Sequence, residues 1–424
     1  MTNQEINSNG QNKQEKIGWY SWVVALLCLC TYAVSFISRN IWSTAIPVAA
    51  PDLGISMTQA GGLVTAYYVG YVAMNFFSGF FVDKFGPRKS LAVSSLLTAV
   101  FTLAIPFSRS YIILFTLRVL AGMASGPLFS GCAKMNLGWF DDKRRATAMG
   151  FIMTGPALGN VIASGVFPNV ITGQGWQMAF TYGGIIALVI AVLFFIFAKE
   201  RGVAKASGAG KQKTAEEKQK DRQGAVRILT TRTLILATLA QFLAIGANNG
   251  FTTWIMKFFV DTQGFTLAAA GGIFAASSAM KLFSGTLSGV ASDLLKSRKK
   301  VAILCGVITC ITVVCLTQFK DTAILWVIML LYGLFSSGLG NPVNTMATET
   351  AKGPFAGTVM GIYNALCQLG SVLFPALLGL ILDIAGGSFF AVLMVIAGSY
   401  FVAAVSAACM KETYGKTSEE IQKK

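Results

Sequence analysis

Long apolar runs, each followed by a short polar stretch, divide most of the chain. A helix that crosses a membrane needs about 20 mostly apolar residues, and runs of that length recur throughout the sequence. We therefore predict an all-α, polytopic membrane protein with twelve transmembrane helices. They are expected at 19–47, 58–82, 90–108, 111–136, 146–170, 178–198, 234–259, 266–291, 300–318, 322–347, 355–380 and 386–409.

A longer polar stretch separates the first six runs from the last six. It is rich in Lys, Gln, Glu, Gly and Ser, a composition that cannot bury a core and is typical of a flexible linker. The polar N-terminus lacks a signal-peptide pattern, so the first apolar run is predicted to remain as an anchor. The predicted parts are an N-terminal tail (1–16), a six-helix half (17–198), a linker (199–233), a second six-helix half (234–410) and a C-terminal tail (411–424).

The charge distribution predicts the topology. The chain carries a formal net charge of +16, which in a soluble protein would suggest a nucleic-acid partner. Here the basic residues gather in the polar stretches on one side of the predicted bundle, for example at Lys84 and Lys89, as the positive-inside rule describes. We therefore expect no nucleic-acid partner, a multi-pass monomer surrounded by lipid in the plasma (inner) membrane, and both termini in the cytoplasm.

The residue inventory argues against an enzyme. The sequence has no histidine, and its eight cysteines lie in or near apolar runs without metal-ligand spacing. No nucleophile stands beside a suitable base. We expect no catalytic residues, no cofactor and no metal.

The two halves repeat each other in sequence. The second run ends with Gly79–Lys89 and the eighth with Gly289–Lys299, 210 residues later. Internal repeats of this kind are typical of secondary transporters, in which the substrate site lies between the halves near the middle of the bilayer.

These repeated elements resemble motifs of the major facilitator superfamily. The motif G-x-x-x-D-K-x-G-x-R-K occupies Gly79–Lys89, its weaker copy occupies Gly289–Lys299, and R-x-x-x-G-x-x-x-G occupies Arg118–Gly126. The resemblance covers residues 17–410 and implies the major facilitator fold, alternating access by rocking of the two halves, and transport without ATP hydrolysis. It also implies a conformational latch, in which a loop aspartate pairs with charged groups of the neighbouring half. The matching residues are Asp83, Arg88 and Asp293.

Three basic residues lie deep within predicted helices: Arg39, Arg118 and Lys281. Charges inside a bilayer are costly, so each is a functional hypothesis. No carboxylate lies at a comparable depth, and an arginine fork matches a carboxylate or phosphate. We predict that these three residues bind an anion. The alternatives are that Arg39 snorkels or bonds helix ends, that Arg118 is a structural or coupling element, and that Lys281 is a solvated cavity lysine.

Four uncharged residues are further candidates for substrate binding. The repeat aligns Tyr71 with Lys281 and Asn249 with Arg39, while Asn364 and Gln368 share a helix face. A polar pair in mid-helix such as Asn248 and Asn249 is expensive unless it is used. The alternative for Tyr71 is helix packing.

The first apolar run, 19–47, resembles one group within the superfamily most closely. Tyr32-x-x-x-Phe36-x-x-Arg39-Asn40 resembles the anion:cation symporters, which implies a small organic anion such as a sugar acid, with Arg39 as its ligand. Symporters of that group usually carry acids where this chain has Ser38 and Ser125. Proton symport by the family route needs a side chain that titrates near physiological pH, which serine does not, and exchange or uniport would fit the sequence equally well.

The predicted function is secondary transport of a small organic anion, a carboxylate or sugar acid, across the plasma membrane. Alternating access would operate as symport or as anion exchange. The partial antiporter motif at Gly155–Gly159 leaves a drug-type exporter of amphipathic compounds as an alternative, and a membrane-embedded sensor as a third.

Overall fold

The computed structural model describes residues 18–199, 228–351 and 356–415. Most of the predicted linker and tails lies outside these ranges. The first half comprises α1 (Trp19–Leu53), α2 (Met57–Phe85), α3 (Pro87–Ala104), the short 3-10 helix η1 (Ile105–Phe107), α4 (Tyr111–Ser125), α5 (Pro127–Trp139), α6 (Asp142–Ile152), α7 (Gly155–Gly165), α8 (Phe167–Gln174) and α9 (Trp176–Phe197). The second comprises α11 (Arg232–Asp261), α12 (Leu267–Leu294), α13 (Arg298–Gln318), α14 (Thr322–Ser336), α15 (Gly340–Thr350), α16 (Ala356–Ile384) and α17 (Phe389–Cys409).

The prediction of an all-α polytopic membrane protein is confirmed. Eleven helical segments in the described ranges are long and apolar enough to cross a membrane. The remaining expected span forms α2, which has the required length but carries several tyrosines and glycines among its apolar residues. Large apolar side chains such as Phe80, Val189 and Phe195 are exposed on the outside of the bundle, as contact with lipid tails requires.

Three of the expected spans are broken rather than continuous. The run 111–136 divides into α4 and α5 at Pro127, the run 146–170 into α6, α7 and α8, and the run 322–347 into α14 and α15. Proline lacks the N–H that continues a helix, and Pro127, Pro156 and Pro168 each occupy the first turn of the helix that follows the break. These breaks kink the helices that surround the space between the halves.

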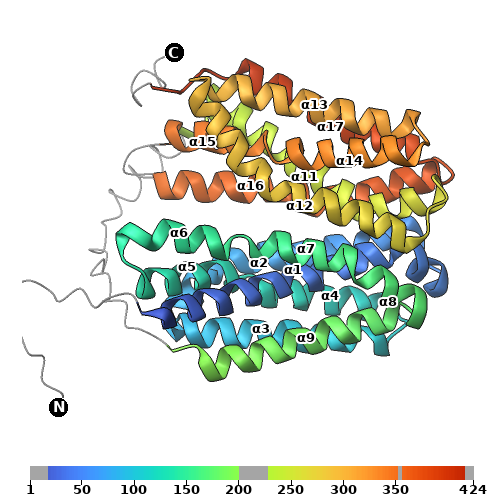
Figure 1. Cartoon of the computed structure of the whole chain (residues 1–424), viewed down its shortest axis with the longest axis horizontal. Coiled ribbons are helices and arrows are strands. Elements are labelled where there is room, and N and C mark those ends of the chain that lie inside the picture. Colours follow the sequence, from blue (N-terminus) through green and yellow to red (C-terminus); the bar gives the residue numbers. More distant parts are fainter. Residues whose placement is uncertain (1–17, 200–227, 352–355, 416–424) are drawn as a thin grey trace, which may run out of the picture.

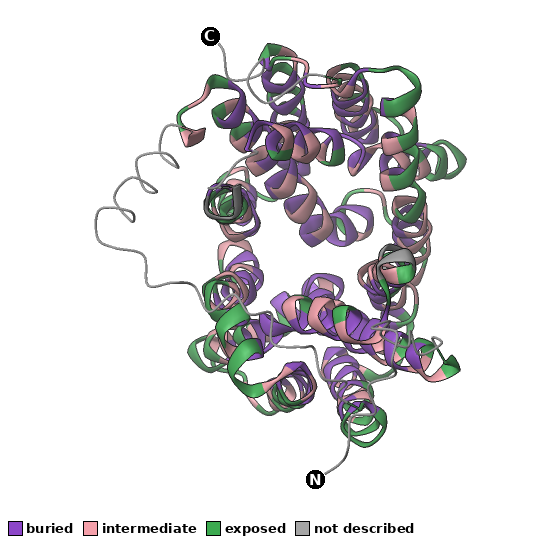
Figure 2. Cartoon of the chain, turned by 90° about the vertical axis from the view of Figure 1, so that its left-hand side faces the viewer, coloured by how far each residue is buried: buried purple, intermediate pink, exposed green. Residues whose placement is uncertain are grey.

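The two halves lie side by side, with blue-to-green helices below and yellow-to-red helices above in Figure 1. We call the end that carries the α2–α3 and α12–α13 turns the basic end, and the other the opposite end. The ribbons of the two halves diverge toward the basic end, which is on the left of Figure 1 and faces the viewer in Figure 2.

Contacts between the halves are concentrated at the opposite end. There, Asp383 of α16 accepts hydrogen bonds from the backbone N–H groups of Met57 and Thr58, at 3.0 and 2.7 Å, and so caps α2. The hydroxyl of Thr65 donates to the carbonyl of Val372 at 2.7 Å. Closer to the basic end, residues 71–78 of α2 and 361–368 of α16 line opposite sides of a cavity. The protein is therefore closed at the opposite end and open toward the basic end.

Candidate functional site

A cavity of about 430 Å³ lies between the two halves and contains two of the three predicted cations. We call it the cationic cavity. The first half supplies residues of α1, α2, α6 and α7 and of the α6–α7 turn, and the second supplies residues of α11 and α12 and Ser337, which follows α14. Its polar lining consists of Arg39, Asn40, Tyr68, Thr154, Asn160, Asn248, Asn249, Thr252, Lys281, Thr286 and Ser337.

Arg39 lies past the middle of α1 with only 7% of its surface exposed. Its guanidinium carbon lies 4.2 Å from the ring centre of Phe36, 5.1 Å from that of Tyr68 and 4.9 Å from that of Tyr71. Aromatic rings attract a cation through their faces but do not neutralise it. The Nε and Nη2 atoms of Arg39 are buried without a hydrogen-bond partner, so the guanidinium retains unused donors beside the cavity.

Lys281 reaches the same cavity from the other half. Its amino group donates to Oδ1 of Asn248 at 2.8 Å and lies 5.2 Å from the ring centre of Tyr332. The neighbouring Asn249 accepts a hydrogen bond from the hydroxyl of Tyr68 at 2.8 Å. A wall of tyrosine and asparagine side chains thus connects the surroundings of Arg39 to those of Lys281 across the boundary between the halves.

Neither cation has an acidic partner within the part of the chain that the structure describes. Among the described residues, no carboxylate forms an ion pair with Arg39 or Lys281, and none lines the cationic cavity. Lysines nearer the helix ends differ, since Lys134 pairs with Asp83 and Lys257 with Asp261, both at 2.7 Å. Because a buried charge without a partner is costly, the cationic cavity is suited to receive an anion.

The structure does not bring Arg118 to this cavity. Arg118 is 1% exposed, and its three nitrogen atoms donate to the carbonyls of Leu63, Ser38 and Arg39 at 3.2, 3.0 and 3.0 Å. These bonds hold the backbone of α1 at the residue that carries the free guanidinium. Arg118 therefore supports the position of Arg39 and is not one of the residues that line the cationic cavity.

Ser38 and Ser125 lie in a buried network of hydroxyl groups behind Arg39. Ser38 shares a hydrogen bond with Thr102 at 2.6 Å, and Ser125 shares one with the hydroxyl of Tyr67. Among the described residues, the partners of Ser38 and Ser125 in this network are hydroxyl groups and carbonyls, and none is a carboxylate.

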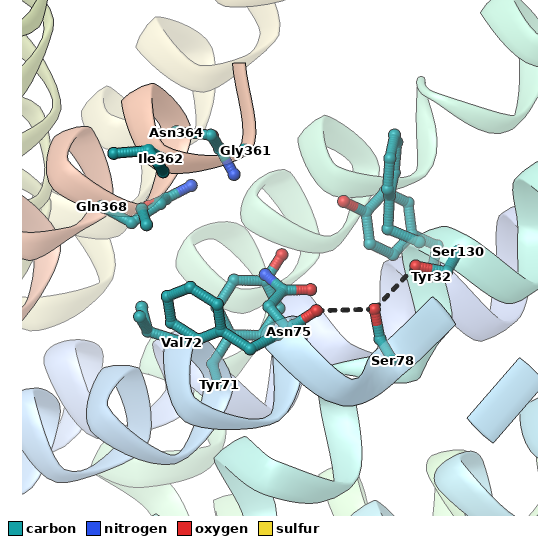
Figure 3. Close-up of a pocket in the computed structure, with 13 residues that line it drawn as sticks. Tyr32, Tyr71, Val72, Asn75, Ser78, Ser130, Gly361, Ile362, Asn364 and Gln368 are labelled. Atoms are coloured by element: carbon teal, nitrogen blue, oxygen red, sulfur yellow. Dashed lines mark hydrogen bonds between the residues drawn. The ribbon is translucent and has the colours of Figure 1, made fainter. Parts of the chain in front are cut away.

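A second cavity, of about 630 Å³, lies on the basic-end side of Arg39. Figure 3 shows Asn364 and Gln368 of α16 across from Tyr71 and Asn75 of α2. Because the ring of Tyr71 contacts Arg39, the two cavities adjoin at the guanidinium. Six of the seven predicted binding residues thus line one or other cavity, in two groups: Arg39, Asn249 and Lys281, and Tyr71, Asn364 and Gln368.

Comparison with known proteins identifies the fold family. The family model described as Major Facilitator Superfamily matches residues 28–375 and 273–423. The chain belongs to the major facilitator superfamily. It is a multi-pass membrane transporter, and the superfamily's two-half architecture accounts for the cavities between the halves.

Three relatives illustrate the superfamily members that resemble this chain. A probable galactarate/D-glucarate transporter of Bacillus subtilis (strain 168) is 26% identical, covering 93% of this chain and 92% of the relative. A hexuronate transporter of the same strain is 25% identical, covering 86% and 88%. A probable sulfoacetate transporter of Cupriavidus necator is 26% identical, covering 88% and 90%.

Solved structures agree on the major facilitator fold. A D-xylose–proton symporter has a TM-score of 0.75 at 14% identity, covering 94% of this chain and 100% of that chain. A bacterial homologue of the lysosomal transporter Spinster, in an inward-facing and unoccupied conformation, has a TM-score of 0.70 at 15% identity, covering 94% and 95%.

The three latch residues of this major facilitator protein bond within their own halves. Asp83 pairs with Lys134, Arg88 donates to the carbonyl of Phe195 at 2.9 Å, and Asp293 lies 3.7 Å from Arg298. None of the three has a described bond to the other half. A latch across the basic end would require the halves to approach there, so its role stays a prediction.

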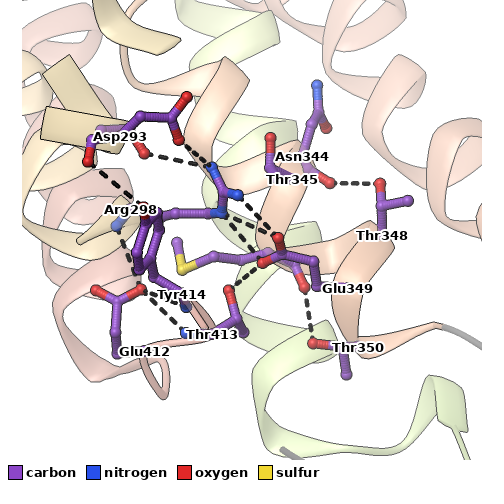
Figure 4. A network of polar contacts seen from close by, with 12 residues as sticks. Asp293, Arg298, Asn344, Thr345, Thr348, Glu349, Thr350, Glu412, Thr413 and Tyr414 are labelled. Carbon is purple, nitrogen blue, oxygen red and sulfur yellow. Dashed lines mark hydrogen bonds and ion pairs between the residues drawn. The ribbon is translucent and has the colours of Figure 1, made fainter. Parts of the chain in front are cut away.

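The basic end of the second half holds a polar network that sequence reasoning did not identify (Figure 4). Arg298 pairs with Glu349 at 2.9 Å, and Glu412 accepts hydrogen bonds from the backbone N–H groups of Arg298 and Lys299, both at 3.2 Å. Glu412 therefore caps the start of α13 from beyond the last helix. Burial tends to raise the pKa of Glu412, but the bonds donated by Ser297 and by backbone N–H groups outweigh burial and lower it.

This lowered pKa predicts a pH-dependent contact. The folded state favours the charged carboxylate, so the cap contributes stability above the usual glutamate pKa of about 4.3 and loses it as the pH falls below that value. We expect hydrogen exchange to show weaker protection of the Arg298 and Lys299 amides at about pH 3 than at about pH 7. Glu412→Gln should reproduce the loss at neutral pH, and equal protection in the parent and variant would contradict the cap.

The sequence analysis assigned no role to Asp383 or Glu349, which lie near the ends of α16 and α15. Their partners lie far away in the chain: Met57 and Thr58 for Asp383, and Arg298 for Glu349. Asn160 was also missed. It lies in a span that the pattern marked only as apolar, and its side chain bonds that of Asn40 in the cationic cavity.

Proposed function

We propose that this major facilitator protein carries a small organic anion, a carboxylate or sugar acid, by alternating access. The observation that carries the proposal is the cationic cavity, in which Arg39 and Lys281 have no carboxylate partner among the described residues. Arg39 would bind an acid group of the substrate through its unused Nε and Nη2 donors, with the two N–H groups in the fork geometry that suits a carboxylate.

The relatives support the same substrate class. Their names refer to galactarate, D-glucarate, hexuronate and sulfoacetate, all of which are small organic anions. An exporter of amphipathic compounds is less well supported, since the cationic cavity is lined by amide and hydroxyl groups as well as its two cations.

We further propose that the basic end faces the cytoplasm of a bacterial cell, with both termini on that side and the protein acting as a monomer in the plasma membrane. The positive-inside rule supports this orientation. The described conformation is then inward-open, and Asp83, Arg88 and Asp293 would engage the opposite half only when the cytoplasmic end closes.

The hydroxyl network around Ser38 and Ser125 supports a coupling mechanism that does not depend on a proton-carrying side chain. Ser38 and Ser125 cannot carry a proton in the way a carboxylate would, so we propose exchange of one anion for another, or entry of a substrate that carries its own proton. In either case, transport of a permanently ionised substrate should not depend on an imposed pH gradient.

Counterflow in proteoliposomes tests the proposal. Vesicles loaded with unlabelled D-glucarate or D-glucuronate should accumulate the labelled compound, at the same rate with and without a pH gradient. Failure of every acid in a panel of mono- and dicarboxylates, together with uptake of an amphipathic cation, would overturn the proposal. A strict requirement for the gradient would overturn the coupling mechanism alone.

A further inference from the structure

The two cations of the cationic cavity belong to different halves of the protein. Arg39 lies on α1 and Lys281 on α12, and both line the same cavity. Arg39 has unused donors, and the only described hydrogen bond of the Lys281 amino group is to a neutral amide. A substrate with one acid group can neutralise only one of them and leaves the other charge buried without a partner, which is costly.

We propose, on the basis of the proposed function, that the preferred substrate is a dianion with an acid group at each end of a short hydroxylated chain. One acid group binds Arg39 and the other binds Lys281. The charge of the substrate then equals the uncompensated charge of the cavity, and a single molecule connects the two halves.

The wall between the two cations suits the hydroxylated middle of such a substrate. It presents the side-chain amides of Asn40, Asn160, Asn248 and Asn249, each of which has donor and acceptor groups. In the described conformation these amides bond to protein groups: Asn40 to Asn160, Asn248 to Lys281, and Asn249 to Tyr68. Hydroxyl groups of a substrate can replace these partners without leaving an amide unsatisfied, whereas an apolar chain cannot.

The division of the two charges between the halves has a mechanical consequence. When the basic end closes, the two halves approach around the bound molecule. A dianion then attracts Arg39 of one half and Lys281 of the other, and so favours closure. A monoanion attracts only one of these cations and leaves the other buried without a counter-charge. Specificity therefore arises at closure as well as at binding.

Binding of three six-carbon acids to the purified protein tests the inference: D-glucarate has two acid groups and hydroxyls, D-gluconate has one acid group and hydroxyls, and adipate has two acid groups and no hydroxyls. By titration calorimetry, we expect D-glucarate to bind at least about tenfold more tightly than D-gluconate, a difference of about 1.4 kcal/mol, because D-gluconate lacks the second charged contact. Adipate should also bind more weakly than D-glucarate.

Variants of Lys281 separate the contribution of its charge to D-glucarate binding from a general loss of ligand affinity. Lys281→Gln should reduce D-glucarate affinity to that of D-gluconate, with little change for D-gluconate itself. Lys281→Arg keeps the charge and should keep most of the preference for D-glucarate over D-gluconate. This result would show that the loss in Lys281→Gln does not come from a folding defect. Lys320→Gln removes an exposed basic residue outside the cavity and is the matched control.

The outcomes distinguish this inference from the function on which it rests. Equal affinities of D-glucarate and D-gluconate in the parent protein, or an unchanged preference in Lys281→Gln, would overturn the dianion inference and leave organic-anion transport standing. Absence of binding by all three acids and by the wider acid panel would overturn the proposed function itself.

Discussion

Replacing Arg39 with glutamine is expected to reduce organic-anion affinity by about 30-fold or more, because removing one partner of a buried charge pair costs about 2–5 kcal/mol. Uptake into proteoliposomes should fall in parallel. The stability of the folded protein should not decrease, because the Nε and Nη2 atoms of Arg39 have no hydrogen-bond partner that the substitution would remove. We therefore expect the Tm of Arg39→Gln in detergent to equal or exceed that of the parent.

Arg118→Gln is the contrasting variant, because it removes an equally buried guanidinium. Three backbone carbonyls of α1 and α2 would each lose a charge-assisted hydrogen bond, and such bonds are stronger than neutral ones, so its Tm should fall clearly. Arg39→Lys keeps the charge without the fork and should bind anions with intermediate affinity. Full uptake by Arg39→Gln, or a lower Tm for this variant than for Arg118→Gln, would contradict these assignments.

The fold could be predicted because the bilayer imposes a strong and local constraint. Each span must be apolar over about 20 residues, so its position is visible in the sequence without knowledge of its neighbours. The breaks within spans were not predicted, although Pro127 and Pro168 are visible in the sequence. A proline in a membrane helix either kinks it or begins a new helix, and packing of the surrounding helices decides between them.

The site was partly predictable for a related reason. Arg39 and Lys281 are conspicuous because charge is costly in a bilayer, and both line the cationic cavity. The same reasoning selected Arg118, whose depth is equal but whose donors are used by carbonyls of α1 and α2. Which way a side chain points depends on the rotation of its helix against several neighbours, and this information is absent from the local sequence.

Contacts between the halves were the least predictable feature, because they join residues that are far apart in the chain, 326 positions in the case of Asp383 and Met57. Asp383 has no assigned role in the sequence analysis, yet it caps α2 of the other half. The repeat at 210 residues aligned Tyr71 with Lys281, but the ring of Tyr71 lies against Arg39 within its own half. A sequence repeat relates equivalent positions and does not determine which of them meet.

The closed end of the protein depends on close backbone contact between the halves, and an added methyl group there is expected to block closure. A Cβ atom on Gly271 of α12 would lie 2.3 Å from the carbonyl oxygen of Ser164, and one on Gly61 of α2 would lie 2.2 Å from that of Pro375. Both obstacles are backbone atoms of the opposite half, so no side-chain rotation relieves them. Small residues permit this close approach of membrane helices.

We expect Gly271→Ala and Gly61→Ala to favour the conformation that is open at the opposite end and to reduce uptake by about tenfold or more, since a destabilisation of 1.4 kcal/mol changes an equilibrium tenfold. Gly272→Ala is the matched control, because a Cβ on this neighbouring glycine meets nothing within 4 Å. Spin labels on the α1–α2 and α16–α17 turns should report a longer distance in Gly271→Ala and Gly61→Ala but not in Gly272→Ala. Anion binding should persist in all three, because the cationic cavity is not lined by these glycines. Parent-like distances and uptake in Gly271→Ala would mean that the halves do not rely on this contact, and that the polar cap at Asp383 is sufficient to close the opposite end.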